Sequence, residues 1–266
     1  MNTIVKLLME LWRSRKIILS FAQNDFKQRY AGSIFGVIWG FVQPIFTILI
    51  FWFVFQVGFR EAPMEDIPFI CWLASGLVPW FFFSEAWLSC SNVFFEYHYL
   101  VKKVVFKTSI LPMVKVLSSL FVHIILVILL IVIYGVYNHY PNVMYLQLIY
   151  YSFCIIILTI GLGFITSSVA PFFKDTISIL NIIVQFGMWM TPIMWDYKKL
   201  NGEFQFMFTI NPMNYIVQGY RDTLINETGF WQRPKETIIF WLITLTIFII
   251  GAALYKRLKP HFADVL

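Results

Sequence analysis

The stretch "VLSSLFVHIILVILLIVIYGVYNHYPNVMYLQLIYYSFCIIILTIGLGFITSSVAPFF", residues 116–173, contains no Asp, Glu, Lys or Arg. An α-helix needs about 20 apolar residues to cross the hydrocarbon core of a bilayer, so this stretch is long enough for two crossings. The segment "YNHYPN", residues 137–142, supplies turn-forming residues between them. The stretch therefore predicts two membrane spans, at residues 113–137 and 145–173.

The whole chain has the composition of a membrane protein. Of its 266 residues, 59% are hydrophobic and 13% are charged, whereas soluble domains carry about 25% charged residues. The net charge is +6, but the basic residues lie beside apolar stretches, which indicates membrane topology rather than nucleic-acid binding. Cys71, Cys90 and Cys154 have apolar neighbours and no metal-ligand spacing, so we expect small core residues and no metal site.

Four further apolar stretches complete the predicted topology. Residues 30–59 carry no charge, and Glu85 is the only charged residue within 67–92. We therefore predict an all-α integral membrane protein with six transmembrane helices in a single domain, residues 1–266. The predicted spans are residues 30–59, 67–92, 113–137, 145–173, 176–195 and 237–255.

The segments outside the spans have their own patterns. In the N-terminal arm, residues 1–29, apolar residues recur at helical spacing with charges between them, which predicts an amphipathic helix at the membrane interface. Residues 93–112 form a loop, and residues 256–266 form a tail. Within residues 196–236, the stretch "FQFMFTINPMNYIVQGY" is apolar but short and contains Pro212, so we expect a re-entrant helical hairpin rather than a full crossing.

The positions of Lys and Arg indicate the orientation. Most of the 20 such residues fall in the N-terminal arm, around the loop at 93–112 and in the tail. Because positive residues concentrate on the cytoplasmic side, we expect both termini in the cytoplasm and the hairpin outside it.

The first predicted span begins with a charged segment, "DFKQRYAGSIFGVIWGFVQPI", residues 25–45. Lys27, Arg29 and Tyr30 lie where the chain enters the inner leaflet. They are either snorkelling anchors for the helix or a docking site for an anionic headgroup, since Arg pairs well with phosphate oxygens.

Three glycines follow at intervals of four residues. On a helix, Gly32, Gly36 and Gly40 would form one smooth strip that lets another backbone approach closely. The strip either packs within one subunit or forms part of a subunit interface or a gate. A homodimer would be consistent with the interface.

The chain lacks the motifs of an energy-coupling or catalytic protein. It has no GxxxxGK[ST], HExxH or GxSxG motif, so it cannot hydrolyse ATP through a phosphate loop and we do not expect an enzyme. His123 lies within a predicted span, where we expect a hydrogen-bonded core residue. The loop "NVFFEYHYLVKKVVFKTSILP" mixes aromatic residues with lysines and is either a solvated loop or a docking surface for a soluble partner.

Five segments in order resemble a known family. They are "DFKQRYAGSIFGVIWGFVQPI", "GLVPWFFFSE", "YLVKKVVFKTSILP", "MTPIMWD" and "INPMNYIVQGYRDTL". Together they resemble the permease subunit of ABC exporters for lipid-linked polysaccharides, the O-antigen, capsule and teichoic acid exporters. The resemblance runs from about Leu7 to Leu266.

The resemblance implies a homodimer in the cytoplasmic (inner) membrane of a bacterium, bound to two copies of a separate ATPase. That partner would bind ATP and Mg²⁺, so no cofactor is expected in this chain. The substrate would be an undecaprenyl-diphosphate-linked polysaccharide received at Lys27, Arg29 and Tyr30. The resemblance also implies an ATPase coupling helix, onto which these residues map: Glu96, Tyr97, Lys102, Lys103 and Lys107.

Aromatic residues could line a polysaccharide path, because sugar rings stack on aromatic faces. The candidates are Trp39, Trp80, Phe81, Phe82 and Phe83; alternatively, these side chains face lipid.

Two other functions stay open. One is an ABC permease that exports a drug or a smaller lipid. The other is a membrane-embedded glycan-processing enzyme, for which Asp196, Glu203 and Asp222 are the available carboxylates outside the membrane.

Overall fold

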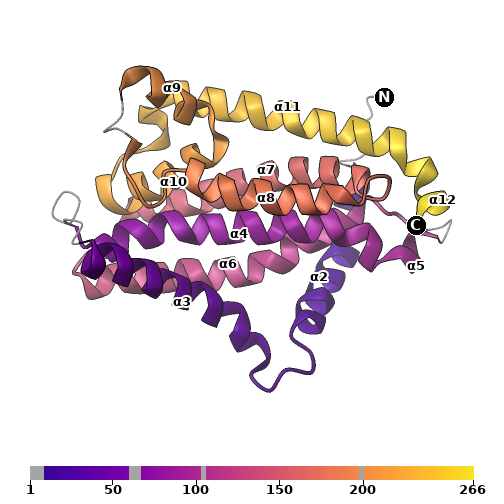
Figure 1. The fold of residues 1–266 in the computed structure, drawn as a ribbon, viewed down its shortest axis with the longest axis horizontal. Coiled ribbons are helices and arrows are strands. Elements are labelled where there is room, and N and C mark those ends of the chain that lie inside the picture. Colours follow the sequence, from indigo (N-terminus) through magenta and orange to yellow (C-terminus); the bar gives the residue numbers. More distant parts are fainter. Residues whose placement is uncertain (1–8, 60–66, 103–105, 198–200) are drawn as a thin grey trace.

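The computed structural model describes residues 9–59, 67–102, 106–197 and 201–266, which form helices joined by short connections (Figure 1). No β-strand occurs in these described ranges. The predicted all-α class is confirmed. The helices are α2 (Arg15–Arg29), α3 (Trp39–Trp52), α4 (Phe69–Glu96), α5 (His98–Val101), α6 (Ile110–Val136), α7 (Gln147–Val169), α8 (Asp175–Met190), α9 (Gly202–Ile210), α10 (Pro212–Arg221), α11 (Pro234–Leu258) and α12 (Phe262–Val265).

Five helical segments in the described part of the chain are long and apolar enough to cross a membrane. They are Gly36–Gly58, Phe69–Glu96, Ile110–Val136, Val143–Val169 and Pro234–Val265. The apolar helix α8 has 16 residues, which rise about 24 Å, less than the roughly 30 Å of a hydrocarbon core. The span predicted at residues 176–195 therefore stays a prediction, as does the total of six.

Helix α4 forms the centre of the bundle. It packs against α6, α7, α10, α8 and α3, and in Figure 1 it runs through the middle of the parallel helices. Its apolar side chains are buried on several sides, for example Leu73, Leu77 and Phe94. A helix that is apolar all round in this way belongs in the interior of a bundle.

The glycine strip predicted at the start of the first span does not form. Gly32 and Gly36 have φ angles of 83° and 52°, and an L-residue helix cannot continue through left-handed positions. The chain instead turns sharply, so α2 and α3 form a V beside the bundle (Figure 1). The continuous helix expected from residue 30 is wrong, and only Gly40 lies inside α3. A role for these glycines at an interface or a gate stays a prediction.

Helix α2 lies across the direction of the bundle helices (Figure 1) and packs against α6. It buries Ile18 and Ala22, while Ile17 and Leu19 are exposed. The amphipathic helix expected in the N-terminal arm stays a prediction, because residues 1–8 lie outside the described residues and α2 carries apolar side chains at both buried and exposed positions. Its position at a membrane interface stays a prediction.

Two short helices, α9 and α10, come between α8 and α11 in the chain and lie at the end of the bundle opposite α12 (Figure 1). Pro212 begins α10, and the Asn211 side chain caps it by accepting a hydrogen bond from the Met213 amide at 3.0 Å. With 9 and 10 residues, neither helix is long enough to cross a bilayer. Re-entry of this pair into the membrane stays a prediction.

Helices α7 and α11 approach each other at two glycines. A Cβ atom on Gly251 would lie 2.6 Å from the Gly161 carbonyl oxygen and 3.1 Å from the Phe164 Cβ. Close backbone contact of this kind stabilises helix pairs in a membrane through van der Waals packing.

We therefore expect Gly251→Ala to destabilise the protein by about 1–3 kcal/mol, because the new methyl group forces the two helices apart. Gly135→Ala is the matched control, since a Cβ at Gly135 meets nothing within 4 Å. Thermal unfolding of the purified protein in detergent measures both. Equal unfolding midpoints for the two variants would show that the α7–α11 contact is not tight.

Candidate functional site

A cleft of about 530 Å³ lies between the end of α2, α3, α4 and α8. It brings together five residues that the sequence singled out, namely Arg29, Tyr30, Trp39, Gly40 and Phe81. Its volume falls in the range of about 300–1,000 Å³ that is typical of ligand pockets.

The turn between α2 and α3 creates this cleft. It folds Tyr30 back onto α3, so that a Cβ on Gly40 would lie only 2.4 Å from the Tyr30 hydroxyl oxygen. Pro44, also in the lining, has no N–H, so the Gly40 carbonyl lacks its usual helical donor. A side chain at position 40 would displace the Tyr30 ring from the cleft.

The cleft holds one ion pair. In the described part of its lining, Arg29 is the only cation and Glu85 the only acid. The Arg29 guanidinium binds the Glu85 carboxylate through Nη1 and lies 3.5 Å from the Asp25 carboxylate through Nη2. The side chain of Glu85 is 39% exposed, so this pair faces open space rather than the core.

A second, polar pocket of about 360 Å³ shares Arg29 with the cleft. Asp25 is its centre. Lys115 Nζ donates to Asp25 Oδ1 at 2.7 Å, and the Tyr97 hydroxyl donates to the same oxygen at 2.8 Å. Lys115 also pairs with Glu96 at the end of α4. This network joins α2, α4 and α6.

Asp25 is ionised at neutral pH despite its burial. Burial raises the pKa of its carboxyl group, but the Lys115 charge and the hydrogen bonds to Lys115 and Tyr97 outweigh burial and lower the pKa below the usual value. Burial and the bond to Asp25 raise the pKa of the Tyr97 hydroxyl, which keeps it a neutral donor. The network is therefore a charged carboxylate held by a cation and a hydroxyl.

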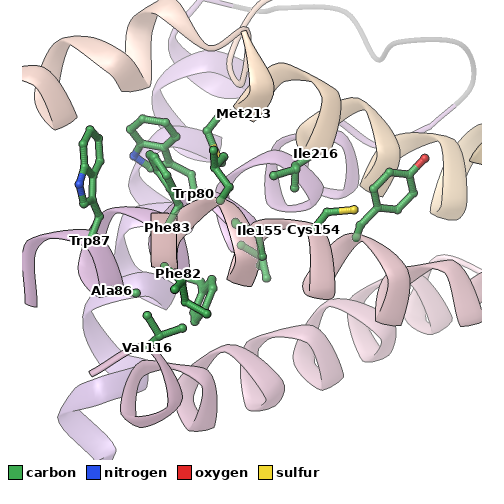
Figure 2. Packing of buried hydrophobic residues seen from close by; sticks show 14 of the residues in the cluster. Trp80, Phe82, Phe83, Ala86, Trp87, Val116, Cys154, Ile155, Met213 and Ile216 are labelled. Atoms are coloured by element: carbon green, nitrogen blue, oxygen red, sulfur yellow. The ribbon is translucent and has the colours of Figure 1, made fainter. Parts of the chain in front are cut away.

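Other predicted site residues lie elsewhere. Lys27 is exposed and does not line the cleft. Trp80, Phe82 and Phe83 are buried in the bundle (Figure 2), with the Trp80 and Phe83 ring centroids 5.5 Å apart. In this chain these three rings pack as core, and a role in a polysaccharide path stays a prediction.

The predicted coupling residues divide into two groups. Glu96 and Tyr97 belong to the Asp25 network. Lys102 and Lys107 are exposed in the following loop, and Lys103 lies outside the described residues. The loop therefore offers exposed positive charge while its beginning is tied to α2.

Buried polar groups occur away from the cleft as well. His123 Nε2 lies 3.0 Å from the Tyr220 hydroxyl, which confirms the prediction of a hydrogen-bonded core histidine. Arg221 donates to the carbonyl oxygens of Pro192 and Ile193 at 2.9 and 2.7 Å and lies over the Trp72 ring. These contacts fix α10 to the bundle.

The carboxylates considered for an enzyme differ in exposure and in ion pairing. Asp222 is buried and pairs with Arg233 at 2.9 Å, whereas Glu203 is exposed on α9. A carboxylate held by an arginine is a structural ion pair rather than a free acid–base group.

Sequence reasoning missed the importance of Asp25, Lys115 and Glu85 as partners. The sequence feature that could have identified them is their position, because each charge lies within or at the border of an apolar stretch. A charge in such a place needs a partner, but its identity depends on the fold.

Removal of Lys115 would leave Asp25 buried without its main cation. We expect Lys115→Met to destabilise the protein by about 3 kcal/mol, since both side chains are 6% exposed. The double variant Asp25→Asn/Lys115→Met should recover most of this loss, and Lys102→Met, at an exposed site, should be neutral. Thermal unfolding of the wild type, of Asp25→Asn and Lys115→Met alone, and of the double variant gives the changes in free energy of unfolding. If the changes of the two single variants simply add up in the double variant, the pairing is contradicted.

Comparison with known proteins places the chain among transporters. The family described as ABC-2 type transporter matches residues 17–225. The chain is 24% identical over 252 residues to an O-antigen export system permease protein RfbA of Klebsiella pneumoniae, covering 94% of this chain and 95% of the relative.

Two further relatives are also similar over most of the length of both chains. An O-antigen export system permease protein RfbA of Myxococcus xanthus is 24% identical over 268 residues, covering 98% of this chain and 99% of the relative. A polysialic acid transport protein KpsM of Escherichia coli is 24% identical over 240 residues, covering 88% of this chain and 90% of the relative. Similarity to these proteins therefore extends over nearly the whole chain.

Proposed function

The chain belongs to the ABC-2 type transporter family, and from that premise we propose that it is the permease subunit of an ABC exporter for a lipid-linked polysaccharide. The substrate would carry an undecaprenyl-diphosphate anchor, as in O-antigen, capsular polysaccharide or teichoic acid export. The single observation that carries the proposal is the cleft that joins Arg29, Tyr30 and Trp39, because it combines a cation with aromatic surface. The nearly full-length similarity to polysaccharide-export permeases supports it.

In this proposal the cleft receives the lipid headgroup. A guanidinium binds phosphate oxygens through two parallel N–H bonds, and the Tyr30 hydroxyl adds a further donor. Trp39 is half exposed and Phe81 partly buried at the cleft, so their rings offer flat apolar faces to a sugar ring or an isoprenoid chain.

The apolar surface of the chain supports a homodimer in the bacterial inner membrane. Only 6% of the apolar window of Gly36–Gly58 is buried within the chain, and α8 exposes Ile182, Phe186 and Trp189. Lipid or a second copy must cover such faces. We place the polysaccharide path between two copies, beside α3 and α8.

ATP hydrolysis would drive export from a separate subunit, present in two copies that bind ATP and Mg²⁺. In the proposed orientation both termini are cytoplasmic, and the loop after Tyr97 faces that subunit. Its exposed Lys102 and Lys107 are suited to an acidic docking surface.

The size of the cleft favours a second candidate, an ABC permease for a drug or a smaller lipid. A volume of about 530 Å³ is sufficient for a drug-sized molecule. The cellular experiment below separates the two candidates.

The experiment is depletion of the protein in its native cell, complemented with the wild type, Arg29→Gln or Lys27→Gln. Depletion should remove the surface polymer and accumulate lipid-linked glycan on the cytoplasmic leaflet. The wild type and Lys27→Gln should restore export, because Lys27 lies outside the cleft. Arg29→Gln should reduce export at least about tenfold, since it removes the cation of the cleft.

Surface polymer and cytoplasmic lipid-linked glycan are quantified after shift to depletion conditions, with immunoblotting to confirm equal membrane insertion. Normal surface polymer without accumulation would overturn polysaccharide export and favour the smaller substrate.

Charge reversal in the loop tests the coupling surface. Lys102→Glu combined with Lys107→Glu should reduce co-purification of the ATPase about tenfold or more, because like charges then face each other. Lys16→Glu, also at an exposed lysine but on α2, is the matched control. Unchanged recovery of the ATPase with the loop variant would contradict the assignment of this loop.

A further inference from the structure

The loop between α4 and α6, which we propose for ATPase docking, is bound to the rest of the chain at both of its ends. Its first end is bound to α2, because the Tyr97 hydroxyl donates to the Asp25 carboxylate. Its second end is bound to α11, because the hydroxyl oxygens of Thr108 and Tyr255 lie 2.6 Å apart. These two residues are 147 positions apart in the sequence. The last turn of α11 therefore reaches the point where the loop ends and α6 begins.

The hydrogen bond between Thr108 and Tyr255 is a single link rather than part of a broad helix contact. Among the described residues, α11 packs broadly against α7 but makes no broad contact with α6. Thr108 is 4% exposed and Tyr255 is 3% exposed, so water does not compete for either hydroxyl. A buried hydroxyl without a partner is unfavourable, and each group therefore keeps the other in place.

A second contact comes from α12, at the C-terminal end of the chain. Pro260 has no N–H to bond the preceding turn, so α11 ends before it. The chain continues into α12 at the end of the bundle where α5 also lies (Figure 1). There the buried ring of Phe262 packs against Phe94, near the end of α4, with centroids 4.8 Å apart, and against Tyr255 at 6.0 Å. The C-terminal segment thus contacts both the helix that leads into the loop and the residue at its far end.

From this geometry we propose that Tyr255 and Phe262 are positioning residues for the loop that docks the ATPase. Both are buried and neither lines the cleft, so they act through the loop and not on the substrate. The inference rests on the proposed function, because the loop is the surface proposed there for the ATPase subunit.

The physical reason is the cost of ordering a loop when a partner binds. A loop that is already fixed at both ends loses little conformational freedom in the complex, so more of the interaction energy appears as affinity. The second fixed end also determines where a movement of the loop is transmitted. A displacement passes to α2 through Tyr97 and to the membrane-spanning segment Pro234–Val265 through Tyr255.

Hydrogen exchange tests the position of the loop without the ATPase. Tyr255→Phe removes the hydroxyl and keeps the ring. In the full-length permease in lipid nanodiscs, peptides that include residues 106–109 should exchange about tenfold faster in Tyr255→Phe than in the wild type, because the end of the loop opens more often.

Tyr134→Phe is the matched control. The Tyr134 hydroxyl is also buried and donates to the Cys71 carbonyl oxygen at 3.1 Å, at the opposite ends of α6 and α4. Its removal should leave exchange at residues 106–109 as in the wild type. If Tyr255 only stabilised the fold, both variants would lower the unfolding midpoint and neither would change exchange selectively at the loop.

The affinity for the ATPase is then measured with the same variants in the intact permease. Tyr255→Phe should raise the Kd for the ATPase about threefold to tenfold, and Phe262→Ala should act in the same direction. Phe262→Leu, which keeps an apolar side chain at this site, should recover most of the affinity. Adding Thr108→Val to Tyr255→Phe should have little further effect, because both changes remove the same hydrogen bond.

The outcomes separate this inference from the proposed function. Exchange at residues 106–109 in Tyr255→Phe equal to that of the wild type would overturn the positioning role. Faster exchange with unchanged ATPase affinity would also overturn it, provided that the Lys102→Glu/Lys107→Glu variant does weaken binding. If that variant leaves binding unchanged as well, the assignment of the loop as the docking surface is overturned instead.

If Tyr255→Phe fails to insert into the membrane, Thr108→Val provides the test from the side of the loop. It removes the same hydrogen bond with a side chain of nearly the same shape. Exchange at residues 106–109 should rise as expected for Tyr255→Phe, and unchanged exchange would overturn the inference.

Discussion

The arrangement of α2 depends on the contacts of one buried carboxylate, that of Asp25. It accepts hydrogen bonds from Lys115 of α6 and from Tyr97 at the end of α4, and it lies beside Arg29 on its own helix. An ionised group with so little exposure is tolerated only when cations and donors surround it. The same contacts therefore determine where α2 lies, and the position of α2 determines where α3 can begin.

This network also connects two surfaces that the proposed exporter would use. Arg29 belongs both to the cleft and to the polar pocket around Asp25, while Glu96 and Tyr97 begin the loop proposed for the ATPase. Charges that share partners cannot be rearranged independently, because a change at one member alters the electrostatic environment of the next. Ion pairs, and not apolar packing alone, therefore connect the cleft to the loop.

The apolar helices divide into covered and uncovered ones. Helix α4 is surrounded by its own chain, whereas α3 and α8 each have a single buried residue, Ile48 and Leu180 respectively. In water such faces would be unfavourable, but in a bilayer lipid or another subunit covers them. The cleft lies between these exposed helices and the buried α4, so it is open to whatever covers the chain.

The sequence by itself determined the helical class and the apolar segments, because a backbone in lipid must satisfy its hydrogen bonds within helices, and long uncharged runs such as residues 116–173 show where this happens. It also indicated Arg29 and Tyr30 from their place beside such a run. Only the tertiary structure decided the turn at Gly32 and Gly36, since glycine permits either sign of φ and periodicity alone reads as helix. The pairing of Asp25 with Lys115, 90 residues apart, likewise depends on how the helices pack, which no local pattern specifies.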